Sequence, residues 1–202
     1  PYAKLVTQLF GDRMYIANAT GCSSIWGGSS PSTPYTIDVN GHGPAWANSL
    51  FEDNAEYGLG MFIAQDTLRN TNIAKLEKIA EENADVKPVV DKFIETKNDA
   101  AANKVATDEL LKAIANINSK EATDVLADKE YLSKKSCWIF GGDGWAYDIG
   151  FGGVDHVLAS GEDVNILVFD TEVYSNTGGQ ASKATPAGAV AQFAASGKRI
   201  KK

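Results

Sequence analysis

The sequence has 202 residues, of which 44% are hydrophobic and 22% charged, values typical of one globular domain or of a domain with an insertion. Its formal net charge of -7 disfavours nucleic-acid binding, because neutralising phosphates requires clustered Lys and Arg. The two cysteines, Cys22 and Cys137, are too few for a disulfide framework, and no apolar run approaches the roughly 20 residues of a membrane span, so we expect a cytoplasmic protein that binds neither nucleic acid nor membrane.

The first 70 residues alternate short apolar runs with loops rich in Gly, Ser and Pro. The first predicted strand leads into a loop, Thr20–Ser24, that contains Cys22. Gly58 and Gly60 fall inside a predicted helix, where they indicate either a weaker helix or close packing. We predict a helix over Lys4–Phe10, strands over Arg13–Ala19 and Tyr35–Val39, and a helix over Asn48–Asn70.

The composition changes between residues 71 and 135, where Lys, Glu, Asp, Asn and Ala dominate and glycine is absent. Apolar residues recur at helical spacing, which predicts about three amphipathic helices with a solvated charged face. We expect this segment to be a helical insertion within a single domain that spans residues 1–202. The periodic apolar positions are Ile73, Leu76, Ile79, Val86, Val89, Val90, Phe93, Ile94, Leu110, Leu111, Ile114 and Ile117.

From Ser136 onward the pattern is that of a βαβ unit. We predict strands over Cys137–Phe140 and Val164–Phe169, joined by a helix over Trp145–Leu158, and a last helix of small residues over Pro186–Ala195. Strand, glycine loop, helix and strand in this order indicate an α/β fold with a parallel sheet flanked by helices.

Two polar loops follow these two strands, Gly142-Asp143-Gly144 after the first and Asp170–Thr177 after the second. Parallel strands place their carboxyl ends at one edge of a sheet, so we expect the loops to lie together. Glycines let backbone N–H groups approach a phosphate, and Asp143 suits Mg²⁺, which prefers oxygen ligands. Gly-Asp-Gly is also common in plain turns, but its position between an apolar strand and a helix favours a diphosphate–magnesium site.

This arrangement resembles the thiamine-diphosphate motif, although Asp170-Thr171 stands where many thiamine enzymes have paired asparagines. Longer strings are similar to the pyruvate:ferredoxin (flavodoxin) oxidoreductase family, and the resemblance covers nearly the whole chain except parts of the helical insertion. These strings are Ala19–Gly28 (ATGCSSIWGG), Gly41–Gly58 (GHGPAWANSLFEDNAEYG), Gly142–Gly150 (GDGWAYDIG) and Thr171–Gln180 (TEVYSNTGGQ).

The resemblance implies a thiamine-diphosphate-binding fold and a role for each matching residue. Asp143, the Thr171 hydroxyl and the Val173 carbonyl would hold magnesium, and Asn176 would lie near the reacting carbon and position the 2-oxoacid. Cys22 would touch the cofactor and ligate one [4Fe–4S] cluster, as thiolates do. The residues expected to line the cofactor are Cys22, Gly142, Asp143, Gly144, Trp145, Thr171, Glu172, Val173, Tyr174, Ser175 and Asn176.

The family's activity is the oxidative decarboxylation of pyruvate to acetyl-CoA and CO₂, with electrons passed through iron–sulfur clusters to ferredoxin or flavodoxin. The resemblance therefore implies pyruvate and coenzyme A as substrates, a homodimer, and the rest of the same polypeptide as partner. The catalytic carboxylate, the substrate arginine and the other cluster ligands would lie outside this chain, which we expect to be inactive alone. Two other functions stay open: a non-oxidative thiamine-diphosphate decarboxylase or carboligase, and a non-catalytic phosphate or nucleotide-binding module.

Overall fold

The computed structural model describes residues 1–29 and 31–200, which form two compact units. The first unit contains Pro1–Phe62 together with the chain from Ser136 onward, and the second contains Ile63–Lys135. Helix α3, Asn54–Glu82, contributes residues to both units. Among the described residues, no helix has both the length and the apolar character that a membrane crossing requires.

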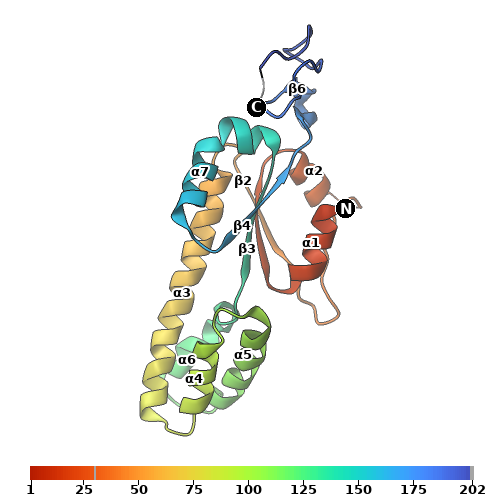
Figure 1. Ribbon diagram of the computed structural model, residues 1–202. Coiled ribbons are helices and arrows are strands. Elements are labelled where there is room, and N and C mark those ends of the chain that lie inside the picture. The colour runs from red at the N-terminus through yellow and green to blue at the C-terminus, as the bar shows by residue number, and fades with distance from the viewer. Residues whose placement is uncertain (30, 201–202) are drawn as a thin grey trace. The chain divides into compact units, whose positions relative to one another are not determined.

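The first unit is built on a four-stranded parallel sheet with the strand order β2-β1-β3-β4 (Figure 1). In the register, Ala17 of β1 pairs with Ile139 of β3, which pairs in turn with Ile166 of β4. Because the strands are parallel, all four carboxyl ends lie at one edge, as the sequence predicts. The strands are β1 Met14–Ala19, β2 Ala45–Ser49, β3 Ser136–Gly142 and β4 Val164–Phe169.

Helices cover both faces of this sheet, which confirms the predicted α/β class. Helices α1 (Tyr2–Phe10) and α2 (Cys22–Gly28) lie on one side, and α7 (Phe151–Ser160) lies with the start of α3 on the other (Figure 1). Each face has its own apolar core. One core contains Met14, Ile16 and Phe140 with Val6, Phe10, Trp138 and Leu167 packed on it; the other contains Ala19, Ala55, Leu59, Ile139, Trp145, Ala146 and Val157.

Gly58 lets α3 lie close to the sheet. A Cβ atom at this position would stand 2.5 Å from Cγ1 of Ile139 and 3.2 Å from Cβ of Ala17. At Gly60 a Cβ atom would meet nothing within 4 Å. Of the two glycines in this helix, only Gly58 is therefore required by close packing.

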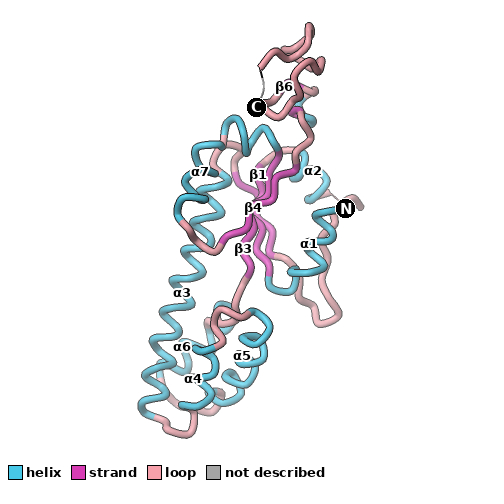
Figure 2. The backbone as a smooth tube through the Cα atoms, viewed as in Figure 1, coloured by secondary structure: helices cyan, strands magenta, loops and turns pink. Residues whose placement is uncertain are grey.

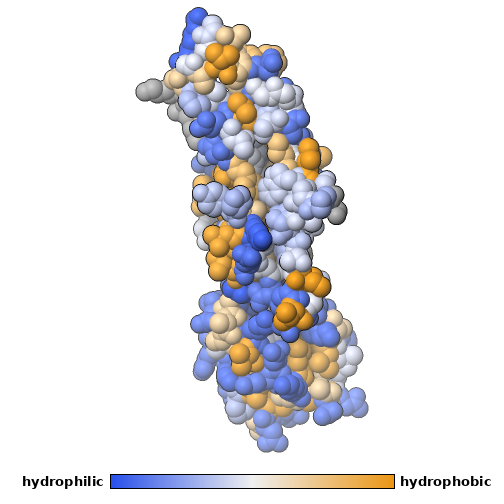
Figure 3. Space-filling model, turned by 90° about the vertical axis from the view of Figure 1, so that its right-hand side faces the viewer, coloured by the Kyte–Doolittle hydropathy of each residue, from blue (hydrophilic) through white to orange (hydrophobic). Residues whose placement is uncertain are grey.

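The second unit is a group of helices around a separate apolar core. It contains the later part of α3 with α4 (Lys87–Glu95), α5 (Ala100–Ile114), α6 (Lys120–Ala127) and a 3₁₀ turn, Lys129–Tyr131. All the periodic apolar residues named above either belong to this core or pack against it. Hydrophilic side chains dominate the outer face of these helices in the view of Figure 3, as expected for amphipathic helices.

Arg69 of α3 is a buried cation that ties loops of the second unit together. Its Nε donates to the carbonyl of Leu132 at 2.9 Å, and its Nη2 donates to the carbonyl of Lys97 at 2.8 Å and to Oδ1 of Asn103 at 3.0 Å. Burial lowers the pKa of this guanidinium. The three acceptors give the buried charge the hydrogen bonds that it needs.

The sequence prediction is wrong for residues 35–54. Tyr35–Val39 forms no strand, and Ile37 and Val39 are 65% and 100% exposed, so the alternating pattern has no sheet to pair with. The strand at this edge is instead β2, Ala45–Ser49, and the helix predicted from Asn48 begins at Asn54. Cys22 is likewise not in a loop, since it is the first residue of α2.

Two helices predicted near the carboxyl end also differ from the structure. Residues 145–158 form a π-helical turn, Gly144–Ile149, followed by α7. Residues 186–195 form turns and isolated β-bridges rather than a helix, because Gly188 and Phe193 have φ values of 86° and 64°. Beyond β4 the chain is mostly loop (Figure 2), with a short antiparallel pair, β5 Val173–Tyr174 and β6 Gln180–Ala181, and a 3₁₀ turn, Ser175–Thr177.

Candidate functional site

A cleft lies at the carboxyl edge of the sheet, where the loops after β1, β3 and β4 meet. It contains nearly all the residues that the sequence predicts for the cofactor site. We call it the strand-end cleft. Its predicted members are Cys22, Gly142, Asp143, Gly144, Trp145, Thr171, Val173, Tyr174, Ser175 and Asn176, and it is also lined by Ala19, Thr20, Gly21, Ser23, Trp26, Phe51 and Phe169.

Asp143 follows β3 directly and is only 1% exposed. Its carboxylate is surrounded by neutral donors. Oδ1 accepts from the backbone amide of Thr171 at 3.2 Å, and Oδ2 accepts from the hydroxyl of Ser182 at 2.5 Å. A buried carboxylate whose hydrogen-bond donors in the described part of the chain are neutral favours a cation nearby.

One oxygen of this carboxylate lies close to two other oxygen atoms, from Thr171 and Val173. The Oγ1 atom of Thr171 lies 3.1 Å from Oδ1 of Asp143 and 3.1 Å from the carbonyl oxygen of Val173. Adjacent ligands of an octahedral Mg²⁺ at 2.0–2.1 Å are separated by about 3.0 Å. The spacing of the carboxylate, hydroxyl and carbonyl oxygens thus matches two edges of such an octahedron.

Gly142 and Gly144 shape the wall of the cleft on either side of Asp143. A Cβ atom at Gly142 would meet only the carbonyl oxygen of Phe169, at 3.8 Å, so the backbone there is open to a ligand. At Gly144 a Cβ atom would stand 2.4 Å from the ring of Tyr174, so only glycine permits this close approach. The space around the backbone therefore explains the two glycines of the Gly-Asp-Gly loop.

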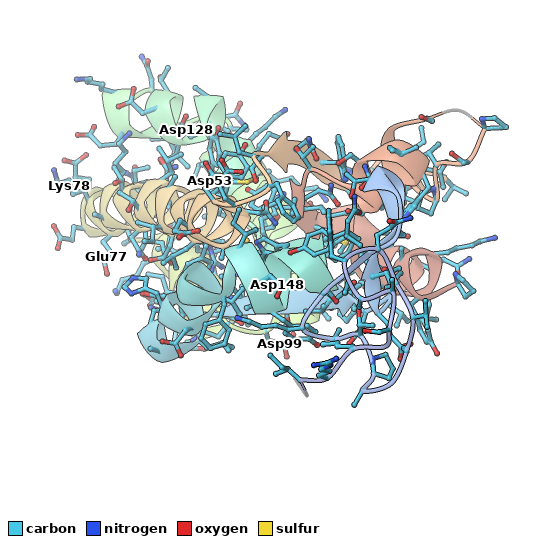
Figure 4. The ribbon with its side chains drawn as sticks, turned by 90° about the horizontal axis from the view of Figure 1, so that it is seen from above. Asp53, Glu77, Lys78, Asp99, Asp128 and Asp148 are labelled. Carbon is cyan, nitrogen blue, oxygen red and sulfur yellow. The ribbon has the colours of Figure 1, made fainter. Side chains whose placement is uncertain are left out.

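The Tyr174 ring that packs on Gly144 donates its phenol proton to Oδ2 of Asp148 at 3.1 Å. Burial raises the pKa of Tyr174 to about 12, and the hydrogen bond to Asp148 and the charges of Asp148 and Asp143 act in the same direction. The phenol is therefore neutral at physiological pH and serves as a hydrogen-bond donor. Asp148, labelled in Figure 4, belongs to the π-helical turn that begins at Gly144.

Cys22 reaches the same cleft from the other side of the sheet edge. Its Sγ atom lies 3.0 Å from Oγ of Ser175, which lies 3.4 Å from Oγ1 of Thr171. The other cysteine, Cys137, is buried in β3, where burial raises the pKa of its thiol to about 12. Of the two thiols, only that of Cys22 lines the cleft.

Glu172 is the one predicted cofactor residue that does not line the cleft. It is exposed, and its φ of 64° is unusual for a residue with a side chain. Glu172, with this backbone conformation, stands between Thr171 and Val173 in the sequence.

Within the described residues, no group of three or more His, Cys, Asp and Glu side chains is arranged to hold a metal ion.

Sequence reasoning missed the apolar wall and one polar partner of the cleft. Trp26 and Phe51 lie within the strings of the family resemblance but give no signal of their own, whereas Ser182 follows the last matching string and contacts Asp143 only through tertiary structure. No spacing rule connects Asp143 with a serine 39 positions later.

Comparison with protein-family models gives no match. The chain is, however, 59% identical over its whole length to the pyruvate:ferredoxin oxidoreductase of Moorella thermoacetica, of which it covers 18%. It is 60% identical over 96% of its length to the pyruvate-flavodoxin oxidoreductase of Enterobacter agglomerans, and 56% identical over 98% to a probable pyruvate-flavodoxin oxidoreductase of Escherichia coli, covering 17% and 16% of these proteins. The chain is thus homologous along its length to a segment of these oxidoreductases and spans about a sixth of them.

Proposed function

We propose that this chain provides the thiamine-diphosphate and magnesium site of a pyruvate:ferredoxin or pyruvate-flavodoxin oxidoreductase. The observation that carries the proposal is the convergence of the Asp143, Thr171 and Val173 oxygens in the strand-end cleft. Their spacing suits magnesium, and their position at the carboxyl edge of a parallel sheet is where α/β folds bind ligands.

In this proposal the three oxygens would hold a magnesium ion, which would offset the negative charge of the cofactor's diphosphate. Gly142 leaves the backbone open to the diphosphate, while Gly144 lets Tyr174 close the cleft beside it. Trp145, buried in the core below, fixes the turn that carries Gly144. Thiamine diphosphate, when bound, supplies the electron sink for decarboxylation of a 2-oxoacid.

The remaining cleft residues account for the oxidative half of the proposed activity. Asn176 would position the 2-oxoacid, and Cys22 would ligate a [4Fe–4S] cluster beside the cofactor. This role is supported by the position of Cys22, which lines the cleft with its Sγ atom 3.0 Å from Oγ of Ser175. A cysteine at this point favours an oxidoreductase over a non-oxidative decarboxylase, because cysteines are the usual ligands of iron–sulfur clusters.

Pyruvate and coenzyme A would be the substrates, and ferredoxin or flavodoxin the electron acceptor, as the names of the relatives suggest. The other cluster ligands, the catalytic carboxylate and the substrate arginine would come from the rest of the same polypeptide. We further propose that the full enzyme is a cytoplasmic homodimer and that the Ile63–Lys135 unit is an insertion in the cofactor-binding domain.

Calorimetry on the full-length enzyme that contains this chain tests the proposal against the two other functions. We expect thiamine diphosphate to bind only with Mg²⁺, ADP not to bind, and the purified enzyme to contain iron. Equal binding of ADP would indicate a general nucleotide or phosphate module. Mg²⁺-dependent binding of thiamine diphosphate to an iron-free enzyme would indicate a non-oxidative decarboxylase or carboligase.

A further inference from the structure

The turn at residues 182–185 touches the magnesium site from outside the cleft. Ser182 is 4% exposed, and its hydroxyl donates to Oδ2 of Asp143 at 2.5 Å. The opposite oxygen of the same carboxylate, Oδ1, is the one that faces Thr171. Ser182 therefore occupies one carboxylate oxygen and leaves the other directed at the proposed metal position.

The hydroxyl of Ser182 is itself fixed within the turn. Its Oγ accepts from the backbone amide of Ala184 at 3.1 Å, so its single proton is left for Asp143. The amide of Ser182 donates to Oγ1 of Thr185 at 2.9 Å. Thr185 in turn donates its hydroxyl to the carbonyl of Glu172, the residue with positive φ between Thr171 and Val173. One turn thus supports the carboxylate ligand and also the loop that carries the other two.

The ammonium group of Lys198 holds this turn closed. Its Nζ donates to the carbonyl oxygens of Ser182, Lys183 and Thr185 at 2.6, 2.6 and 2.7 Å. All three donor positions of the ammonium are therefore used on one turn. The amide of Lys183 adds a further link, since it donates to both carboxylate oxygens of Asp148 at 3.2 Å.

We infer that Ser182 is a positioning residue for the metal ligand Asp143 and that the Lys198 ammonium maintains the turn that presents it. This inference rests on the proposed magnesium site and extends it to two residues outside the cleft. Partners of metal ligands commonly set metal affinity, because they fix which ligand oxygen faces the ion. Ser182 performs this task without contacting metal or substrate.

The test measures Mn²⁺ binding, as a spectroscopic substitute for Mg²⁺, by electron paramagnetic resonance on the full-length enzyme with thiamine diphosphate present. We expect Ser182→Ala to weaken Mn²⁺ affinity about tenfold. Ser182→Thr, which retains the hydroxyl, should restore most of it, and saturating metal should return kcat of Ser182→Ala close to the wild-type value. Ser160→Ala is the matched control, because its hydroxyl donates to the Val157 carbonyl on α7 at 2.7 Å and should leave Mn²⁺ affinity unchanged.

A second pair of variants makes the test independent of the folding of Ser182→Ala. Lys198→Met removes the ammonium that holds the turn, whereas Lys183→Met removes a neighbouring ammonium that lies 5.8 Å over the Phe151 ring. We expect only Lys198→Met to weaken Mn²⁺ binding. Wild-type affinity in Ser182→Ala, or equal affinities in the two lysine variants, would overturn the inference. The variant Asp143→Asn distinguishes a failure of this inference from a failure of the proposed function. Normal Mn²⁺ binding in Asp143→Asn as well would show that the proposed metal site itself is wrong.

Discussion

Cys22 and Ser175 are 153 residues apart in the chain, yet their side chains meet at 3.0 Å in the strand-end cleft. The contact arises because β1 and β4 end at the same edge of the sheet. From Ser175, hydroxyl contacts lead to Thr171 and then to Asp143. At the residue scale, a thiol and the three oxygens proposed to hold magnesium therefore share one cleft, as the proposed function requires.

The proposed role of Cys22 as a cluster ligand predicts that its substitution lowers the iron content but leaves cofactor binding intact. In the full-length enzyme, Cys22→Ser should retain Mg²⁺-dependent thiamine-diphosphate binding, because the metal ligands are untouched. It should lower the iron content and slow the reduction of ferredoxin or flavodoxin, since a hydroxyl is a poor cluster ligand. Iron analysis and dye-free electron-transfer assays measure both effects.

Cys137→Ala is the matched control, because that thiol is buried outside the strand-end cleft, where it donates to the Gly58 carbonyl at 3.7 Å. It should lower stability without affecting iron content. Full iron occupancy and unchanged electron transfer in Cys22→Ser would show that Cys22 has a purely structural role.

At the scale of elements, the cleft depends on how closely α3 and α7 approach the sheet. Gly58 permits the approach of α3, and the core on that face includes Ile139 and Trp145, the residue that follows the Gly-Asp-Gly loop. Packing in this core therefore bears directly on the strand β3 that ends at Gly142.

Two glycine substitutions in α3 test this packing. Gly58→Ala should destabilise the protein by about 1–3 kcal/mol, because the added methyl group would overlap the fully buried Ile139. Gly60→Ala adds the same methyl group in open space and should stabilise the helix by about 1 kcal/mol. Denaturant unfolding measures both changes. Equal stabilities for the two variants would show that α3 does not pack as described.

The central strands β1 and β3 and the edge strand β4 are predictable from the sequence, because all three are apolar runs that lie between two layers of helices. Strand β2 is not, since AWANS at the sheet edge is half-exposed and resembles a loop. Tyr35–Val39 alternates as a strand would, but its side chains Ile37 and Val39 face solvent. Local pattern cannot show whether a neighbouring strand exists.

The same limit applies to the site. The Gly-Asp-Gly loop and the Thr171–Asn176 loop are recognisable because both follow apolar strands of one βαβ unit. Ser182, Thr185 and Lys198 carry no such signal, because they reach Asp143 and its neighbours through turns whose geometry depends on tertiary hydrogen bonds. Alanine and small residues at 186–195 favour a helix, yet positive φ values at Gly188 and Phe193 exclude one.

At the scale of the whole molecule, the proposed site is local although the proposed enzyme is large. All three proposed magnesium ligands come from one βαβ unit, and residues of the turn that follows it hydrogen-bond to them and to their loop. The chain spans about a sixth of its curated relatives, so the electron path and the substrate-binding groups would depend on other parts of the polypeptide. The Ile63–Lys135 unit has its own core and contributes none of the residues of the strand-end cleft.

The most direct measurement is the affinity of the full-length enzyme for thiamine diphosphate, titrated with and without Mg²⁺, in Asp143→Asn and Asp143→Ala. Asparagine keeps the size of the side chain and removes its charge, so the proposed site loses the one charged ligand among its three. We expect both variants to melt cooperatively and to lose about 2 kcal/mol or more of binding free energy, about 30-fold or more in affinity. The exposed carboxylate of Asp155 on α7 gives the control Asp155→Ala, which should bind as the wild type does. Wild-type, Mg²⁺-dependent affinity in both Asp143 variants would contradict the magnesium site and the proposed function with it.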